Sequence, residues 1–142
     1  MKKILLLLAM AVATYSYAGP RSIQQKLAED FPNASNVQWY NDDNGYTAYF
    51  STPQARVRVY YDKDQKFLYA LKYYTAKELP LNIVRNATQK YSGYTIKTVT
   101  EMTTDESTKY ELLLENETTF KKVMFYADGS TEVLQKMTKQ AQ

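Results

Sequence analysis

One apolar pattern occurs twice in this chain and constrains its fold more than any other feature. Ile23, Leu27 and Phe31 are spaced four residues apart, so their side chains would lie along one face of a short helix. The spacing returns sixty residues later at Ile83, Ala87 and Tyr91. Pro32 follows the first set and Gly93 the second, and both favour the end of a helix. The sequence therefore predicts an internal duplication in which each half begins with a helix.

Each predicted helix is followed by segments in which apolar and polar residues alternate, as in β-strands with one buried face. Short turn-forming stretches separate them, such as Asn44-Gly45, a pair typical of tight hairpins. We expect strands over 36–40, 46–51, 55–61 and 67–74, and over 94–102, 109–115, 119–126 and 130–138. The predicted fold class is α+β, a two-layer tandem repeat. Each unit would pack one main helix on a four-stranded antiparallel meander, with the sheets joined into one curved sheet.

The N-terminus has the pattern of a secretory signal peptide. Lys2 and Lys3 precede an apolar run, and Ser16 and Ala18 are small residues ahead of a cleavage site before Gly19. The apolar run is roughly half as long as a membrane-spanning helix requires. We therefore divide the chain into a signal peptide, 1–18, a first repeat, 19–74, and a second repeat, 75–142. The mature protein is expected in the periplasm or outside the cell, without a membrane span.

The composition excludes several classes of function. The 142 residues include no Cys and no His, which removes disulfides, thiolate nucleophiles, zinc–thiolate sites and imidazole bases. Loss of Lys2 and Lys3 with the signal peptide leaves 16 basic and 15 acidic residues, a net charge of +1. Binding to nucleic acid needs many clustered phosphate contacts, which this balance does not supply. We predict no enzyme, no cofactor and no nucleic-acid partner.

Several motifs resemble the PepSY-like family of exported bacterial proteins. In the first half these are Phe31-Pro32-Asn33-Ala34-x-x-Val37-x-Trp39 and Val57-x-Val59-Tyr60-Tyr61-Asp62. In the second half they are Glu78-Leu79-Pro80, Tyr91-Ser92-Gly93-Tyr94-x-Ile96 and Phe125-Tyr126-Ala127-Asp128-Gly129. The resemblance covers nearly all of 21–138 and rests on helix ends and strand turns.

This resemblance implies the fold of the β-lactamase inhibitor protein (BLIP). It also implies a non-catalytic periplasmic module that binds or inhibits another protein. The β-lactamase inhibitor has disulfides and inhibitory loops that no position of this chain matches, so inhibition of a β-lactamase is not implied.

Strand alternation assigns side chains to the two faces of the predicted sheet. Tyr46, Ala48 and Phe50 share a phase with the apolar positions Val57, Val59 and Tyr61 and should face the helices. The opposite face would be open and would carry aromatic and basic side chains, a composition typical of protein-recognition surfaces. The candidate partner-binding residues are Tyr49, Arg56, Arg58, Tyr60, Phe120, Lys122 and Met124. We expect Tyr40, Lys72 and Tyr74 to join this face.

Three functions from different classes remain open. The leading hypothesis is an exported binding or inhibitor-like module that uses the open face to engage an unidentified periplasmic or envelope protein or peptide. The alternative is a structural or cell-envelope assembly protein, for example a homodimer, and a hydrolase with an unrecognised carboxylate site is third. Asp62 and Asp64 resemble the opening of a calcium loop but lack its later ligands, so the sequence leaves cation binding there undecided.

Overall fold

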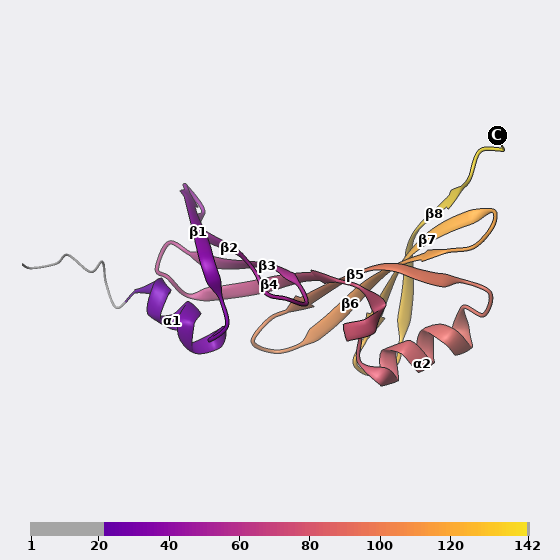
Figure 1. The fold of residues 1–142 in the computed structure, drawn as a ribbon, viewed down its shortest axis with the longest axis horizontal. Coiled ribbons are helices and arrows are strands. Elements are labelled where there is room, and N and C mark those ends of the chain that lie inside the picture. The colour runs from indigo at the N-terminus through magenta and orange to yellow at the C-terminus, as the bar shows by residue number, and fades with distance from the viewer. Residues whose placement is uncertain (1–21, 142) are drawn as a thin grey trace, which may run out of the picture.

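The computed structural model describes residues 22–141 (Figure 1). The predicted signal peptide, 1–18, and its cleavage site between Ala18 and Gly19 lie outside the described residues. The elements are α1 (Ile23–Asp30), β1 (Ser35–Asp42), β2 (Gly45–Ser51), β3 (Arg56–Asp62), β4 (Phe67–Tyr74), the 3-10 turn η1 (Ala76–Glu78), α2 (Leu81–Lys90), β5 (Thr95–Thr103), β6 (Thr108–Glu115), β7 (Thr119–Tyr126) and β8 (Thr131–Thr138).

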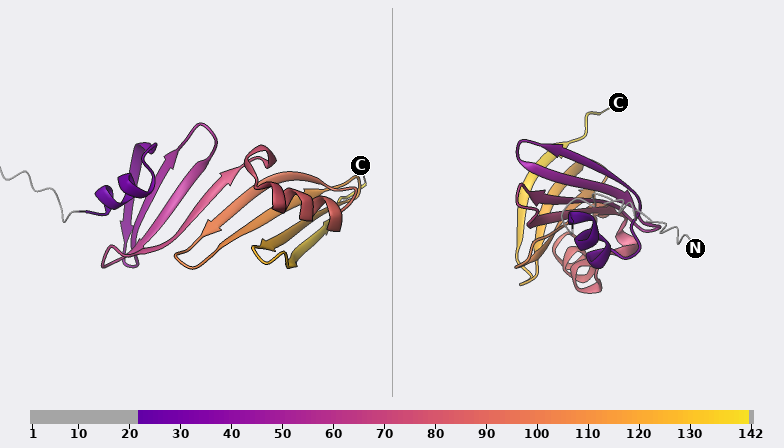
Figure 2. Two further views of the ribbon diagram at one scale, coloured as in Figure 1. Left: turned by 90° about the horizontal axis from the view of Figure 1, so that it is seen from below. Right: turned by 90° about the vertical axis from the view of Figure 1, so that its left-hand side faces the viewer.

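All eight strands belong to one antiparallel sheet in the order β1 to β8, so each strand pairs only with its neighbours in sequence. The pairing continues from β4 to β5, where Ala70 lies opposite Thr103 and Tyr74 opposite Val99. Both helices lie on the same side of this sheet (Figure 2). The other side, called the open face below, has no helix against it in the part of the chain described.

The predicted fold class is wrong. The chain does not divide into two repeat units that each pack a main helix on a four-stranded meander; it is mostly one continuous eight-stranded sheet with two short helices. The helices have 8 and 10 residues, and each ends within a residue of the aromatic that closes its apolar stripe, Phe31 or Tyr91. They are too short to form a full second layer, and the ladder between β4 and β5 leaves no boundary in the sheet.

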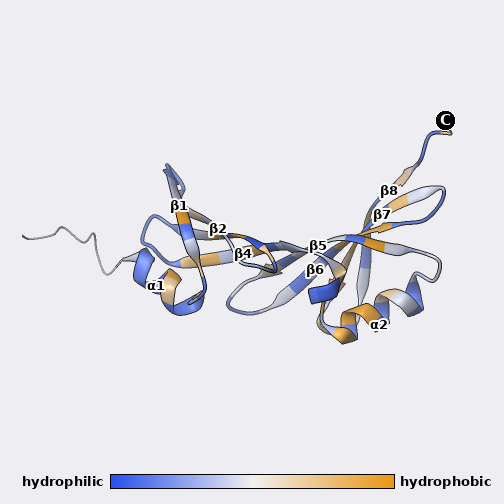
Figure 3. Ribbon diagram, viewed as in Figure 1, coloured by the Kyte–Doolittle hydropathy of each residue, from blue (hydrophilic) through white to orange (hydrophobic). Residues whose placement is uncertain are grey.

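The hydrophobic core lies between the helices and the sheet and consists of two clusters. Ile23 and Leu27 of α1 pack in one cluster with β2, β3 and β4, and Ile83 and Ala87 of α2 pack in the other with β5, β6 and β7. Burial of these four side chains confirms the helical spacing, whereas Phe31 and Tyr91 are only partly buried. Figure 3 shows apolar and polar residues alternating along α2, as an amphipathic helix requires.

The predicted alternation along the central strands is confirmed. The buried positions on the helix side are Ala48, Phe50, Val57, Val59 and Tyr61, and farther along Leu112, Leu114, Val123 and Phe125. The residues between them point to the open face because side chains alternate across a strand. None of the helices between residues 22 and 141 is long and apolar enough to cross a membrane.

Candidate binding surface on the open face of the sheet

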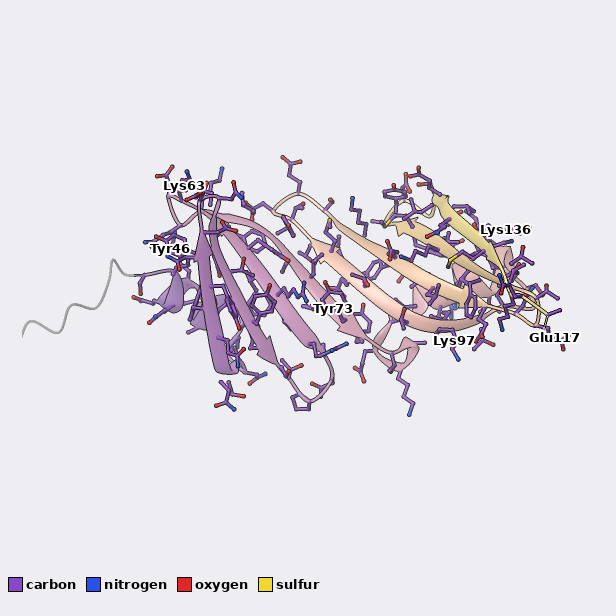
Figure 4. All side chains as sticks on the ribbon, turned by 90° about the horizontal axis from the view of Figure 1, so that it is seen from above. Tyr46, Lys63, Tyr73, Lys97, Glu117 and Lys136 are labelled. Carbon is purple, nitrogen blue, oxygen red and sulfur yellow. The ribbon has the colours of Figure 1, made fainter. Side chains whose placement is uncertain are left out.

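Five side chains on β2, β3 and β4 form a compact group on the open face, here called the tyrosine–arginine cluster: Tyr49, Arg58, Tyr60, Tyr69 and Tyr73. Strand register brings them together, because Arg58 lies opposite Tyr49 and Tyr60 lies opposite Tyr69. Cross-strand neighbours on one face lie within about 5 Å. Figure 4 looks onto this face, with Tyr73 near the middle of the sheet.

Arg58 is the central cation of the cluster. Its guanidinium carbon lies 4.9 Å from the centroid of the Tyr49 ring and 5.6 Å from that of Tyr73. Such contacts hold a cation over the electron-rich face of an aromatic ring without neutralising its charge. Hydrogen bonding with the Tyr60 side chain raises the pKa of Arg58 above its usual value. Within residues 22–141 neither Arg56 nor Arg58 forms an ion pair, so both charges are free for an external anion.

The tyrosines hold one another in place. The rings of Tyr60 and Tyr69 stack with their centroids 4.4 Å apart and an interplanar angle of 26°. Tyr40 and Tyr49 meet edge to face at 5.0 Å and 83°. Aromatic pairs at these distances contribute about 0.5–1.5 kcal/mol beyond their buried area. The surface is therefore built from mutually packed rings with little freedom to rearrange.

A cavity of about 550 Å³ opens on this part of the sheet. Gln38, Tyr49, Arg56, Arg58 and Tyr73 line it together with the N-terminal end of β1. The pairing of β1 with β2 is irregular between Ser35 and Gln38, and Asn36 adopts a left-handed backbone with φ 52°. Asn tolerates this region better than most residues. This irregularity moves the start of β1 out of register with β2 beside the arginines.

The charge on this part of the open face has one sign. Around the cluster, the outward positions are Thr47, Tyr49 and Ser51 of β2, Arg56, Arg58 and Tyr60 of β3, and Tyr69, Leu71 and Tyr73 of β4. They include two arginines and no carboxylate. The carboxylate of β3 on this face, Asp62, lies at the far end of the strand, four residues from Arg58, where it accepts hydrogen bonds from its own turn and forms no ion pair with either arginine. Its chemistry favours an anionic ligand with apolar or aromatic neighbours.

Phe120, Lys122 and Met124 lie on the open face of β7, as predicted, opposite Glu115, Leu113 and Glu111. They do not join the tyrosine–arginine cluster, because three strands separate β7 from β3. Adjacent strands are about 4.8 Å apart, which places the two groups roughly 19 Å from each other. The predicted site residues therefore form two groups.

The group on β7 differs in its electrostatics. The Lys139 ammonium lies 4.7 Å from the Phe120 ring centroid and 2.6 Å from a Glu115 oxygen, and Lys97 lies 3.0 Å from the other oxygen. Hydrogen bonds from Lys139 and Lys97 hold the pKa of Glu115 below its usual value. Lys122 forms no ion pair among the described residues, but Glu111 and Glu115 flank its cross-strand partner Leu113 on the same face. The arginines of the tyrosine–arginine cluster have no such carboxylates beside them, so we take that cluster as the candidate site.

Two predictions about β4 are wrong. Lys72 and Tyr74 do not lie on the open face; they lie opposite Val57 and Val99, on the helix side. There the Tyr74 hydroxyl donates a 2.6 Å hydrogen bond to Glu101, and the Lys72 ammonium lies 3.4 Å from the same carboxylate. Burial and this hydrogen bond raise the pKa of Tyr74. Glu101 therefore gives polar partners to Lys72 and Tyr74, the two side chains that we predicted on the open face. Tyr40 does lie on the open face, 57% exposed.

Sequence reasoning missed Tyr69, Leu71 and Tyr73 as residues of the open face. A bulge between Tyr60 and Tyr61 shifts the pairing of β3 with β4, so the phase of β4 cannot be copied from β3. The available signal was Ala70, a small apolar residue between Tyr69 and Leu71, which is almost completely buried. Taking Ala70 as inward would have assigned all three residues correctly.

The Asp62 carboxylate caps its own turn. One of its oxygens accepts hydrogen bonds from the backbone N–H groups of Asp64 and Lys66, both at 2.9 Å. Across the described part of the chain, no group of three or more acidic, His or Cys side chains is arranged to hold a metal ion.

The comparisons with known proteins give a fold but no family. No protein-family model and no curated protein matches the chain. A BLIP-like protein from Bacteroides fragilis has 20% identity and a TM-score of 0.62, covering 87% of this chain and 89% of its own. A DUF2874 family protein from Bacteroides uniformis has 19% identity and a TM-score of 0.61, covering 84% and 89%.

A protein from Bacteroides eggerthii, assigned provisionally to the periplasm, has 21% identity and a TM-score of 0.61, covering 84% of this chain and 88% of its own. Identities this low show a shared fold alone. The BLIP-like fold implied by the sequence motifs is supported, and the PepSY-like assignment is not confirmed.

Proposed function

We propose that this protein is an exported, non-catalytic binding module whose open sheet face engages a protein or peptide. The observation that carries this proposal is Arg58, a cation packed between the rings of Tyr49 and Tyr73 without an ion-pair partner in residues 22–141. An arginine that packs on aromatic rings without an ion-pair partner keeps its charge and its hydrogen-bond donors available for recognition.

The surroundings of Arg58 support the same function. Tyrosine and arginine are enriched among residues that dominate binding energy at interfaces. Rings that already pack together, as Tyr60 and Tyr69 do, lose little conformational freedom when a partner covers them. The predicted residues Tyr49, Arg56, Arg58 and Tyr60 would form the centre of the contact, and Phe120, Lys122 and Met124 its far edge.

The fold and the N-terminus support export. Structures with the same fold include a BLIP-like protein and one assigned provisionally to the periplasm. The signal-peptide pattern in 1–18 agrees with that location. The module would act in the periplasm, or outside the cell, after cleavage between Ala18 and Gly19.

Affinity capture tests the proposal. Residues 19–142 would be immobilised and exposed to an envelope extract of the source organism, and the captured proteins identified by mass spectrometry. The Tyr49→Ala, Arg58→Ala and Tyr60→Ala variants should each lose the specific partner, while Lys63→Ala, in an exposed turn away from the cluster, should retain it (Figure 4). Circular dichroism would establish that all variants are folded. Capture that is unchanged in the three cluster variants would contradict the proposal.

One observation favours the alternative of a self-associating assembly protein. The edge strand β8 exposes apolar side chains at Val133 (50%), Leu134 (45%) and Met137 (37%). An exposed apolar edge can pair with another strand. Light scattering over a range of protein concentrations tests this possibility, and a monomer at every concentration would exclude it.

A further inference from the structure

Arg56 and Arg58 stand two residues apart on the same strand and point to the same side. Cross-strand register places Arg56 opposite Ser51 and Tyr73, and Arg58 opposite Tyr49 and Leu71. A strand advances about 3.3 Å per residue, so the two backbone positions are about 6.6 Å apart. The open face therefore carries two arginine side chains whose backbone positions have the i, i+2 repeat of an extended chain.

An extended peptide carries its own side chains at the same repeat. Carboxylates at positions i and i+2 point to one side about 6.6 Å apart, whereas adjacent carboxylates point to opposite sides. A guanidinium binds a carboxylate with two parallel hydrogen bonds, which fixes direction as well as distance. Two arginines in this arrangement match two alternate carboxylates better than they match one anion.

The surroundings of the arginines fit such a segment. Arg56, Arg58, Tyr49 and Tyr73 all line the cavity of about 550 Å³. The cross-strand neighbours of the two arginines include no carboxylate, and Asp62, at the far end of β3, is engaged by its own turn, so a bound acidic segment would meet little repulsion beside the arginines. The Gln38 side chain, also lining the cavity, can donate a further hydrogen bond.

We propose that the ligand of this face is an extended acidic segment of a protein, with Glu or Asp at alternate positions, whose carboxylates bind Arg56 and Arg58. This inference rests on the proposed function and adds the chemistry of the partner. The ring of a residue between or beside the carboxylates would pack against Tyr49 or Tyr73.

The test compares peptides of equal composition. Acetyl-Ser-Glu-Tyr-Glu-Ser-amide has alternate carboxylates, and acetyl-Ser-Glu-Glu-Tyr-Ser-amide has the same residues with adjacent ones. Titration calorimetry should show the alternate peptide binding about five-fold tighter, since one well-placed exposed ion pair is worth up to about 1 kcal/mol. Replacement of both Glu by Gln should abolish the binding. Equal affinity for the two acidic peptides would overturn the proposal.

Variants assign the binding to the two arginines. Arg56→Gln and Arg58→Gln should each weaken the alternate peptide about five-fold, and Arg58→Lys should weaken it as well because an ammonium lacks the planar two-pronged geometry. Lys63→Gln removes the same charge from a distant exposed turn and should change affinity less than two-fold, the scale expected of simple long-range charge. Equal losses in Lys63→Gln and Arg58→Gln would overturn the proposal.

Two further results separate this inference from the proposed function. If partner capture depends on Tyr49 and Tyr60 but the alternate peptide neither binds nor competes, the binding face stands and the acidic-segment proposal falls. If the protein ignores the peptide but binds phosphatidylglycerol vesicles through Arg58, the ligand is a lipid surface and the proposal is again overturned. Partner capture that no cluster variant alters removes the proposed function itself.

Discussion

Tyr61 combines tight packing with an unpaired polar atom. The residue is 2% exposed, and its ring packs against Trp39 and Phe67 at centroid distances of 6.1 and 6.2 Å. Its hydroxyl is buried without a hydrogen-bond partner in the described structure. Burying an unsatisfied hydroxyl typically costs about 1–3 kcal/mol, and this cost offsets part of the energy gained from the ring.

Tyr61→Phe should therefore raise the free energy of unfolding by about 1 kcal/mol, because it removes the unpaired hydroxyl and keeps the ring. Urea denaturation at neutral pH measures the change. Tyr46→Phe, in a partly buried position of the same cluster, serves as the comparison and should be nearly neutral. A loss of stability in Tyr61→Phe would show that the hydroxyl has a partner, such as an ordered water.

The same residue predicts a pH dependence. Burial, assisted by the negative charge of Asp30, raises the pKa of Tyr61 to about 12 from a usual value near 10. Below pH 10 both the folded and the unfolded states keep the proton. Between pH 10 and 12 only the unfolded state releases it, so the free energy of unfolding falls. Tyr61→Phe should lose less stability than the wild type over this interval, as urea titrations at pH 9 and 11.5 would measure.

At the scale of elements, the tightest constraint is the hairpin between β1 and β2. One Asp42 oxygen accepts hydrogen bonds from the N–H groups of Asn44, at 2.7 Å, and Gly45, at 3.2 Å. Gly45 has φ +147°, and a Cβ atom there would lie 2.1 Å from the Tyr61 carbonyl oxygen. The hairpin therefore depends on a glycine for both its backbone angle and its close approach to β3.

Gly45→Ala should destabilise the protein by about 2 kcal/mol or more, since it adds backbone strain of about 1–3 kcal/mol and a clash with main-chain atoms. Gly129→Ala is the matched control: Gly129 also has a positive φ, +84°, but nothing lies within 4 Å of a Cβ there. Thermal denaturation of the two variants separates clash from strain. Equal losses would mean that β2 can shift to accommodate the methyl group.

The sequence predicted the elements better than their assembly. Local patterns were enough to predict the buried face of each helix, as at Leu27 and Ala87, and the buried and exposed sides of β2 and β3. The fold class failed because an apolar stripe shows which face of a helix is buried but not whether the helix is long enough to be the main element of a repeat unit; these helices have only 8 and 10 residues. The site was half predicted: Tyr49 and Arg58 follow from alternation, whereas Tyr69 and Tyr73 depend on a bulge between Tyr60 and Tyr61. A bulge inserts one residue into a strand, so every later side chain of that strand points to the opposite face of the sheet from the one that simple alternation predicts.

At the scale of the whole molecule, the first prediction concerns removal of the predicted signal peptide, residues 1–18, from the exported protein. Mass spectrometry of the exported protein should give an N-terminus at Gly19, because Ser16 and Ala18 supply the small residues that signal peptidase cleavage requires. Ala18→Arg, which disrupts this site, should cause the precursor to accumulate. A mature protein that retains residues 1–18 would contradict the predicted cleavage.

The order of the strands also has a consequence for how the chain folds. Six of the seven strand pairs are closed by connections of two to four residues, whereas β4 and β5 are joined through 75–94. Closing about twenty residues instead of four costs about 1.4 kcal/mol more in chain entropy. We therefore expect the β4–β5 ladder to form after the rate-limiting step. Weakening it with Tyr74→Phe, which removes the hydrogen bond to Glu101, should then speed unfolding and leave the refolding rate almost unchanged in stopped-flow measurements.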